Sequence, residues 1–320
     1  MFFVFKGIRG CRPGSIRRNA ACCKKRKGGK KRMVELKNEK FCVKIDTHGA
    51  ELKSVRGNGR EYMWHGDPKF WNRTSPVLFP FVGAVRDDVY RYEGKEYPMS
   101  QHGFARDMEF TLLSSDAEKA SFRLVSTEET KEKYPFDFEL VITYELRENE
   151  LTVLWNVKNT NEKRMYFSIG AHPAFLCKLD ENGTIGGNYL KFDAEGERTA
   201  TDFSDGLVQN TTHSVNLDED SCFALDEHTF DNGVLIFEKD QAKRVALVDK
   251  EKKPYVTVSF DTPLFGVWAP EKKNAPFLCI EPWYGRADRA DFTGEISERE
   301  YEESLEAGGS FQGSYRILFE

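Results

Sequence analysis

The chain has 320 residues, of which 39% are hydrophobic and 13% aromatic, a composition that suits a folded protein with a sizeable core. Its net charge is −5, but residues 1–32 hold 12 Lys or Arg and no acidic residue, so the remaining residues carry 35 basic against 52 acidic side chains and a net charge of −17. Because nucleic acids and anionic membranes bind clustered cations, this acidic body argues against both as partners, and without a run of about 18 apolar residues no membrane-spanning helix is expected.

The first 32 residues differ in kind from the rest of the chain. Their opening MFFVF is too short for the core of a signal peptide, and the block KKRKGGKKR at 24–32 is expected to be disordered by self-repulsion. Such an extension could be a transit peptide or a nuclear-type address, or the native chain could start at Met33. We favour the last, because VELKNEKFCVKID after Met33 has the pattern of a strand, and we treat 1–32 as a basic extension outside the fold.

From Met33 onward the sequence predicts one β-strand after another. Phe41, Val43 and Ile45 alternate with polar neighbours. The clearest signal is a hairpin, in which apolar residues recur at every second position over 136–146 and again over 151–157. Further strands are expected at 120–126, 164–169, 234–238, 244–248, 255–260, 264–268 and 314–319. This alternation is typical of antiparallel sheets with one buried face.

Residues 297–307 are the only segment with the pattern of a helix, with Ser297 as the cap and Glu300 three residues further on. Many strands and few helices predict an all-β fold, a large and mostly antiparallel sandwich. No internal repeat and no linker follow residue 33, so we expect residues 33–320 to form one domain.

The seven cysteines lie at positions without the spacing of metal ligands: 11, 22, 23, 42, 177, 222 and 279. Their odd number leaves at least one unpaired. We interpret them as the reduced thiols of a cytoplasmic protein.

The segment APFLCIEPWYGRAD at 275–288 places one carboxylate at the end of an apolar stretch. Residues 277–280 read as a buried strand, and because Pro282 cannot donate to a ladder, the chain is expected to leave the sheet just after Glu281. Aromatic neighbours could desolvate this carboxylate, raise its basicity and suit it to general-base catalysis. The alternative is a structural role, for example as a partner of Arg286.

Two further segments place a histidine in a comparable setting. In QHGFARD at 101–107, a glycine next to His102 leaves room for another chain segment or a ligand. In FSIGAHPAF at 167–175, His172 follows a strand. For a single histidine a structural hydrogen bond is the usual alternative. Together, two histidines and a glutamate suit a reaction that removes one proton from a neutral polyol and supplies another.

Other features of the sequence favour some classes of function and argue against others. Tryptophans at 64, 71, 268 and 283 could stack on a sugar ring, although core packing is their more common role. No His-x-His or His-x-x-x-His pair occurs, so no metal site is expected. The chain also lacks a Gly-x-Ser-x-Gly elbow, a P-loop and a dinucleotide fingerprint, which argues against covalent hydrolases and nucleotide-driven enzymes.

Three segments in order, LFPFVGAVRDDVYRYEGKEYPMSQHGFARD at 78–107, FSIGAHPAF and LCIEPWYGRAD, resemble the aldose 1-epimerase (galactose mutarotase-like) superfamily, and most closely its LacX-like branch. The resemblance covers essentially the whole chain from Met33. It implies a galactose mutarotase-like β-supersandwich with few short helices. It also implies an isomerase that interconverts the α and β anomers of an aldohexose, with a sugar as its small-molecule partner and no cofactor.

The resemblance also implies a role for each acid–base residue. Glu281 corresponds to the general base that takes the proton of the C1 hydroxyl, and His172 to the general acid that protonates the ring oxygen. The ring then opens, rotates about C1–C2 and closes as the other anomer. His102 corresponds to the histidine that holds the sugar and stabilises the ring oxygen. This chemistry requires an ionised Glu281 and a protonated His172, which favour each other if they are close.

The resemblance is incomplete at two positions. The family often has a sugar-contacting arginine directly after the glycine of FPFVG, where this chain has Ala84. Arg86, which we expect on the same face of a strand, could replace it. The family's substrate-binding aspartate has only a weak counterpart, Asp231 in TFDNGVLIF. The other expected substrate-binding residues are Phe104, Arg106, Trp268, Trp283 and Arg286.

Two alternative functions stay open. A hexose-6-phosphate 1-epimerase shares the fold, and three arginines could contact a phosphate or pair with neighbouring carboxylates: Arg86, Arg106 and Arg286. A non-catalytic sugar-binding domain on the same fold is favoured by Ala84 but opposed by the retained glutamate and histidines. The sequence does not predict which sugar is bound or the oligomeric state.

Overall fold

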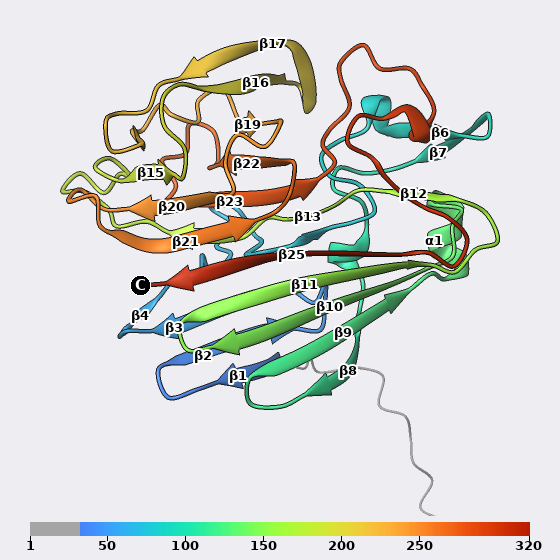
Figure 1. Cartoon of the computed structure of the whole chain (residues 1–320), viewed down its shortest axis with the longest axis horizontal. Helices are drawn as coiled ribbons and strands as arrows, with labels where there is room; N and C mark the ends of the chain where they lie inside the picture. The colour runs from blue at the N-terminus through green and yellow to red at the C-terminus, as the bar shows by residue number, and fades with distance from the viewer. Residues whose placement is uncertain (1–32) are drawn as a thin grey trace, which may run out of the picture. The chain divides into compact units, whose positions relative to one another are not determined.

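The computed structural model of the chain describes residues 33–320, so the expectations for residues 1–32 concern a segment outside this range (Figure 1). Every ladder between the named strands of the described part is antiparallel, and its one α-helix is α1 (Glu128–Lys133). This confirms the predicted all-β, antiparallel fold class. Within residues 33–320, no helix has the length and apolar character needed to cross a membrane.

The largest sheet has nine strands and contains the predicted hairpin. Its strands, in spatial order, are β18 (Cys222–Ala224), β15 (Tyr189–Phe192), β20 (Arg244–Val248), β21 (Pro254–Phe260), β25 (Ser310–Phe319), β11 (Glu150–Asn159), β10 (Phe138–Arg147), β9 (Lys119–Val125) and β8 (Thr111–Ser115). β10 and β11 pair from Phe138 opposite Asn159 to Arg147 opposite Glu150. Buried residues alternate along β10, as the period of two in the sequence requires.

A second large sheet of eight strands carries the candidate site. Its order is β17 (Leu207–Val215), β16 (Arg198–Ser204), β19 (Leu235–Phe237), β22 (Leu264–Trp268), β23 (Phe277–Tyr284), β13 (Ile169–Ala171) and β5 (Val77–Leu78), while β14 (Ala174–Leu176) also pairs with β23. The bounds of β19 to β22 agree within a few residues with the predicted strands.

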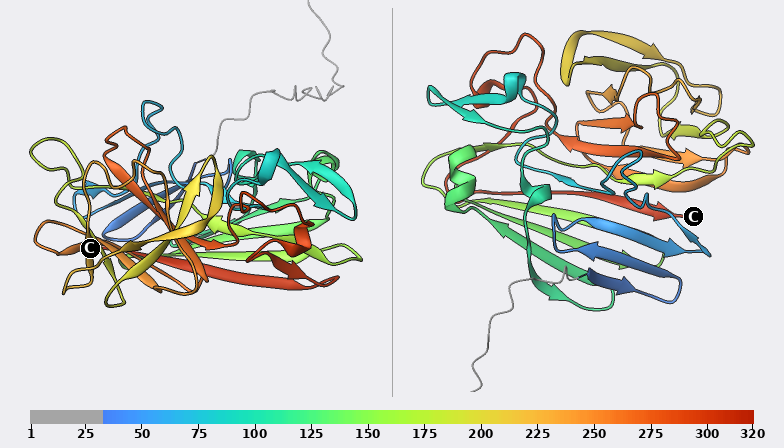
Figure 2. Two further views of the ribbon diagram at one scale, coloured as in Figure 1. Left: turned by 90° about the horizontal axis from the view of Figure 1, so that it is seen from above. Right: turned by 180° about the vertical axis from the view of Figure 1, so that it is seen from behind.

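Three smaller sheets complete the described part. The four-stranded sheet has the order β1 (Met33–Lys37), β2 (Phe41–Asp46), β3 (Leu52–Gly57) and β4 (Arg60–Glu61), and two pairs join β6 (Val89–Tyr92) to β7 (Lys95–Pro98) and β12 (Met165–Phe167) to β24 (Glu303–Leu305). Seen from behind, the four-stranded sheet covers one face of β9 to β11 (Figure 2). The apolar residues of both sheets share one core, and each fully buried large side chain there stabilises the fold by about 1.5–3 kcal/mol.

Two predictions of local structure are wrong. Residues 297–307 are not a helix, because the chain there forms only a 3₁₀ turn, η3 (Ile296–Glu298), followed by β24. Arg299 and Glu302 of this segment are buried in an ion-pair network, which holds the backbone in an irregular path. Arg86 does not lie on a strand but in the 3₁₀ turn η1 (Arg86–Asp88).

Candidate active site

The register of β23 places His172 opposite Glu281. β13 pairs with the end of β23, where Gly170 lies opposite Trp283, and β14 pairs with its beginning in the same register. His172 lies in the short gap between β13 and β14, and the common register puts it across from Glu281. Two residues that are distant in the sequence therefore become a cross-strand pair.

The expectation that β23 ends just after Glu281 is wrong. The strand continues to Tyr284, with Pro282 opposite Phe265 of β22. The proline is accommodated because the ladder on the other side of β23 is interrupted between β14 and β13, so this edge requires no backbone donor there. Glu281 consequently lies within β23 and not at the end of the strand.

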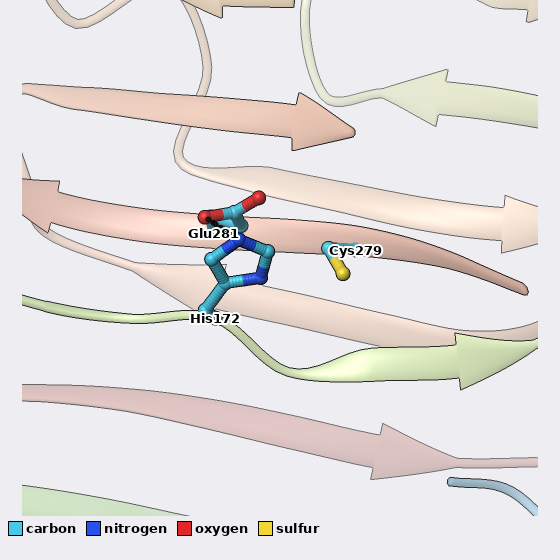
Figure 3. A group of neighbouring side chains, drawn as sticks. All are labelled: His172, Cys279 and Glu281. Atoms are coloured by element: carbon cyan, nitrogen blue, oxygen red, sulfur yellow. Dashed lines mark ion pairs between the residues drawn. The ribbon is translucent and has the colours of Figure 1, made fainter. Parts of the chain in front are cut away.

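The side chains of His172 and Glu281 meet in a nearly water-free setting. Nε2 of His172 lies 3.3 Å from Oε2 of Glu281, and the two residues are 7% and 1% exposed (Figure 3). Trp71 stacks on the imidazole with ring centroids 4.7 Å apart, and Trp268 meets it edge-on at 5.3 Å. These indoles fix the orientation of the imidazole, so the pair is held as a rigid unit.

His102 approaches the same pair from a different segment. Its ring centroid lies 5.6 Å from that of His172, and its backbone has a φ of 67°. The next residue is necessarily a glycine, because a Cβ on Gly103 would lie 2.3 Å from the carbonyl oxygen of Phe79. The space that the sequence suggested for a ligand is thus filled by another segment of the chain.

A backbone contact defines the tautomer of His102. The N–H of Gly83 donates to Nδ1 of His102 at 3.0 Å, and the N–H of His102 donates to the carbonyl of Gly83. Because Nδ1 accepts, the proton of the neutral ring lies on Nε2. Burial and the nearby His172 lower the pKa of His102 well below its usual value, so the ring is a neutral hydrogen-bond donor.

A pocket of about 370 Å³ opens over these residues, a volume in the range typical of small-molecule sites. Its polar lining consists of Gln101, His102, Arg106, His172, Glu271 and Glu281. Its aromatic lining consists of Trp71, Phe203, Trp268 and Trp283. This combination of flat apolar rings with a few convergent polar groups suits a sugar, which has both apolar ring faces and hydroxyl groups.

Burial controls the protonation of the central pair. It raises the pKa of Glu281 well above its usual value, an effect that the indole of Trp283 partly offsets. Burial, with a contribution from Arg106, lowers the pKa of His172 to about 3. The structure therefore favours a neutral pair with the shared proton on Glu281, whereas the sequence led us to expect an ion pair. Both forms hold one proton, so a transfer within the pair converts one into the other.

Arg106 is the one arginine predicted at the substrate that lines this pocket. It donates to the carbonyl of Gln101 at 2.6 Å, and its buried Nε lies 3.7 Å from Oδ2 of Asp107 but has no hydrogen-bond partner among the described residues. Trp268 and Trp283 also line the pocket, as predicted. These three side chains are therefore available to a bound ligand.

The other predicted substrate-binding residues lie elsewhere. Arg86 donates to the carbonyl of Phe292 at 3.2 Å, and Phe104 packs against aromatic rings of the core. Asp231 bonds to His228 at 2.9 Å and lines a neighbouring groove. Arg286 is buried and bonds to Glu238 at 2.6 Å and to Glu300. None of the four lines the pocket over the histidines, because their side chains are engaged by nearer partners.

Sequence reasoning missed several lining residues, among them the aromatic Phe203 and the charged Glu271. Phe203 lies at the end of β16, and Glu271 lies in the loop after β22. Neither belongs to a sequence motif that would have indicated a functional role. Only the tertiary structure brings them to the pocket.

Comparisons with known proteins identify the family of the chain. Residues 32–302 match the family described as aldose 1-epimerase, and the chain belongs to that family. It is 32% identical to Protein LacX of Lactococcus lactis subsp. lactis over 262 residues, which cover 79% of this chain and 87% of that protein. It is 22% identical to the putative glucose-6-phosphate 1-epimerase of Escherichia coli K12 over 74% of this chain and 77% of that protein.

A solved structure shows the same fold. The galactose mutarotase related enzyme from Lactobacillus acidophilus superimposes with a TM-score of 0.85 at 33% sequence identity, over 90% of this chain and 97% of that chain. The predicted galactose mutarotase-like fold is therefore confirmed.

Proposed function

We propose that this member of the aldose 1-epimerase family interconverts the anomers of an unphosphorylated aldohexose, with Glu281 as general base, His172 as general acid and His102 as hydrogen-bond donor. The observation that carries the proposal is the 3.3 Å contact between His172 and Glu281 beside a tryptophan-walled pocket. The C1 hydroxyl and the ring oxygen of a sugar are bonded to the same carbon. A base and an acid that act on both must therefore be adjacent.

The proton balance of the reaction fits a pair that shares one proton. Transfer from the carboxyl of Glu281 to His172 gives the carboxylate and the imidazolium without exchange with solvent. The carboxylate takes the proton of the C1 hydroxyl, the bond between C1 and the ring oxygen breaks, and the imidazolium protonates that oxygen. After rotation about C1–C2 the same steps run in reverse on the other face of the aldehyde. No electrons are gained or lost, so the chemistry requires no cofactor.

His102 and Arg106 support this chemistry without exchanging protons. The proton on Nε2 of His102 can donate to the ring oxygen as that oxygen becomes more negative. Arg106 lies in the lining with a buried Nε that has no hydrogen-bond partner in the described residues, and it supplies a cation in a chain that has Ala84 instead of the arginine that often follows FPFVG in the family. The positive charge of Arg106 also lowers the pKa values of His102 and His172, so it opposes their protonation.

The charge of the pocket favours a free sugar over a sugar phosphate. Arg106 is the one cation of the lining, and it is accompanied by Glu271 and Glu281. Arg86 and Arg286, which could have bound a phosphate, are engaged away from the pocket. A dianionic phosphate would therefore lack the paired donors that it usually finds in proteins. The Escherichia coli relative, named for a phosphorylated sugar, shares only 22% identity.

We propose a cytoplasmic location, which rests on the interpretation of the scattered cysteines as reduced thiols. The described cysteines, at positions 42, 177, 222 and 279, are free.

Anomerisation assays with three sugars test the proposal. Freshly dissolved α-glucose, α-galactose and α-glucose 6-phosphate are followed by polarimetry or NMR with and without the protein. We expect the protein to accelerate the anomerisation of a free hexose, with a kcat/KM at least about tenfold above that for glucose 6-phosphate. A tenfold difference corresponds to roughly 1.4 kcal/mol in transition-state stabilisation. Acceleration of the phosphate alone would establish the hexose-6-phosphate epimerase, and sugar binding without acceleration would establish the non-catalytic domain.

A further inference from the structure

Three different metal-binding side chains converge at the centre of the site. The donor atoms of His172, Cys279 and Glu281 all lie within 4.8 Å of one another, and all three residues are buried (Figure 3). Cys279 and Glu281 are two positions apart on β23, so both side chains project from the same face of the strand. His172 reaches them from the facing segment. The prediction that no metal site exists considered only the spacings of histidines and cysteines within the sequence, which cannot reveal donors from facing strands.

The histidine has a donor atom that the central pair does not use. Nδ1 of His172 is buried and has no hydrogen-bond partner among the described residues. Oε2 of Glu281 is also buried, and its contact in the pair is the one with Nε2 of His172 at 3.3 Å. Cys279 is fully buried between apolar residues and does not line the pocket. Buried polar atoms without partners are unusual, and a site for an ion is one explanation for them.

We infer that His172, Cys279 and Glu281 form a site for a zinc ion, which would bind in competition with the sugar and reversibly inhibit the enzyme. One nitrogen, one sulfur and one oxygen donor suit zinc, whereas calcium and magnesium prefer oxygen ligands alone. Three protein ligands leave a fourth position for water on the side of the pocket. The competition with sugar depends on the proposed function, since it assumes that the same histidine and glutamate contact the substrate.

Binding would require small movements and the release of protons. Zinc lies about 2.0–2.3 Å from its ligands, so the donor atoms would have to approach one another by about 1 Å from their largest separation. The thiol of Cys279 and the carboxyl of Glu281 each give a proton to solvent as the bonds to the ion form. No electron is transferred.

Spectroscopy with Co²⁺ in place of zinc tests the site without using activity. The full-length protein is used with Cys11, Cys22 and Cys23 replaced by serine, so that the N-terminal thiols do not contribute. We expect one bound Co²⁺ per chain and a near-ultraviolet charge-transfer band from the bond to sulfur. The Cys279→Ala variant should lose the band, whereas Cys222→Ala, which replaces another buried thiol in β18, should keep it. An unchanged band in Cys279→Ala would overturn the inference.

Titration with zinc provides the second measurement. Cys279→Ala and Cys279→Ser should each weaken zinc binding at least about tenfold, and Cys222→Ala should not. The turnover that each Cys279 variant shows without zinc should no longer fall when zinc is added, whereas zinc should still inhibit Cys222→Ala. Equal zinc affinity in Cys279→Ser and the parent protein would contradict the site. If the protein binds zinc through Cys279 but turns over no sugar, the metal site stands and the proposed function fails.

Discussion

The neutral tautomer of His102 is the clearest example of a residue whose chemistry is determined by the backbone. The N–H of Gly83 occupies Nδ1, and burial keeps the ring uncharged, so Nε2 can only donate. A donor of this kind stabilises an oxygen more strongly as negative charge develops on it. The role differs from that of His172, whose ring gains and loses a proton in the mechanism that we propose.

This difference predicts the effect of replacing His102. His102→Ala removes the donor and should lower kcat/KM by about 10²–10³, the usual loss for one donor to a developing negative charge. His102→Gln should recover part of the loss, because its amide can donate. His48→Ala serves as the control, since His48 bonds to Glu109 and does not line the pocket. Steady-state kinetics of the three variants measure these effects. Equal turnover in His102→Ala and His48→Ala would exclude this role.

β22 and β23 lie side by side beneath the site, and a glycine of β22 packs against large side chains of β23. Gly266 lies opposite Glu281, and a Cβ there would come within 2.4 Å of the indole of Trp283. The missing side chain therefore gives Trp283 the space in which it forms one wall of the pocket. Here a glycine in a strand marks a close packing contact.

Gly266→Ala should consequently disturb both stability and turnover. We expect a loss of about 1–3 kcal/mol in the free energy of unfolding, the usual cost of overpacking, together with reduced activity because Trp283 is displaced. Trp283→Phe removes part of the obstructing ring. In a double-mutant cycle measured by urea denaturation, the second change should reduce the cost of the first. Strictly additive effects would show that the two side chains do not meet.

The segment after β23 is held by a buried network around Arg299. Its Nε donates to Asp288 at 2.7 Å, it also pairs with Glu302, and all three side chains are at most 5% exposed. Ser168 donates to the same carboxylate of Glu302 at 2.7 Å, which links this segment to the strand before His172. The network therefore positions the loops beside the site.

Arg299→Met should destabilise the protein strongly. It leaves two buried carboxylates without their cation, and breaking a buried ion pair typically costs about 3–5 kcal/mol. Arg56→Met is the matched control, because Arg56 is 73% exposed and its bond to Glu61 should contribute less than about 1 kcal/mol. Chemical denaturation of both variants measures the difference. Similar losses for the two would mean that the network around Arg299 contributes little.

For the whole molecule, the all-β class and the hairpin of β10 and β11 could be predicted because apolar residues alternate along them. The convergence of His102, His172 and Glu281 on one pocket could be predicted from the three segments that resemble the family. Phe203 and Glu271 could not, because only the tertiary structure brings the end of β16 and the loop after β22 to the pocket. The segment 297–307 was predicted as a helix because Ser297 and Glu300 form a helix-capping pattern that is visible in the sequence. The buried ion pairs that determine its actual path depend on the folded structure and cannot be seen in the sequence.

The stability of the whole molecule should depend on pH through Glu302. Burial raises its pKa to about 7 despite the opposing effect of Arg299, whereas the unfolded carboxyl has a pKa of 4.5. Because the folded state holds the proton more tightly, this contribution is fully present below pH 4.5 and is lost as the pH rises through 7. The total change is about 3 kcal/mol. Unfolding free energies at pH 5 and pH 8 should differ less in Glu302→Gln than in the parent protein, and an identical difference would contradict the assignment.

The measurement that tests the account most directly is the turnover of Glu281→Gln beside its sugar affinity. Glutamine keeps the size of the side chain but cannot accept the proton of the C1 hydroxyl. We predict that the sugar still binds, as judged by calorimetry, while the anomerisation rate falls by about two to four orders of magnitude. Undiminished turnover in this variant would show that the buried carboxylate opposite His172 is not the base, and the proposed mechanism would be wrong.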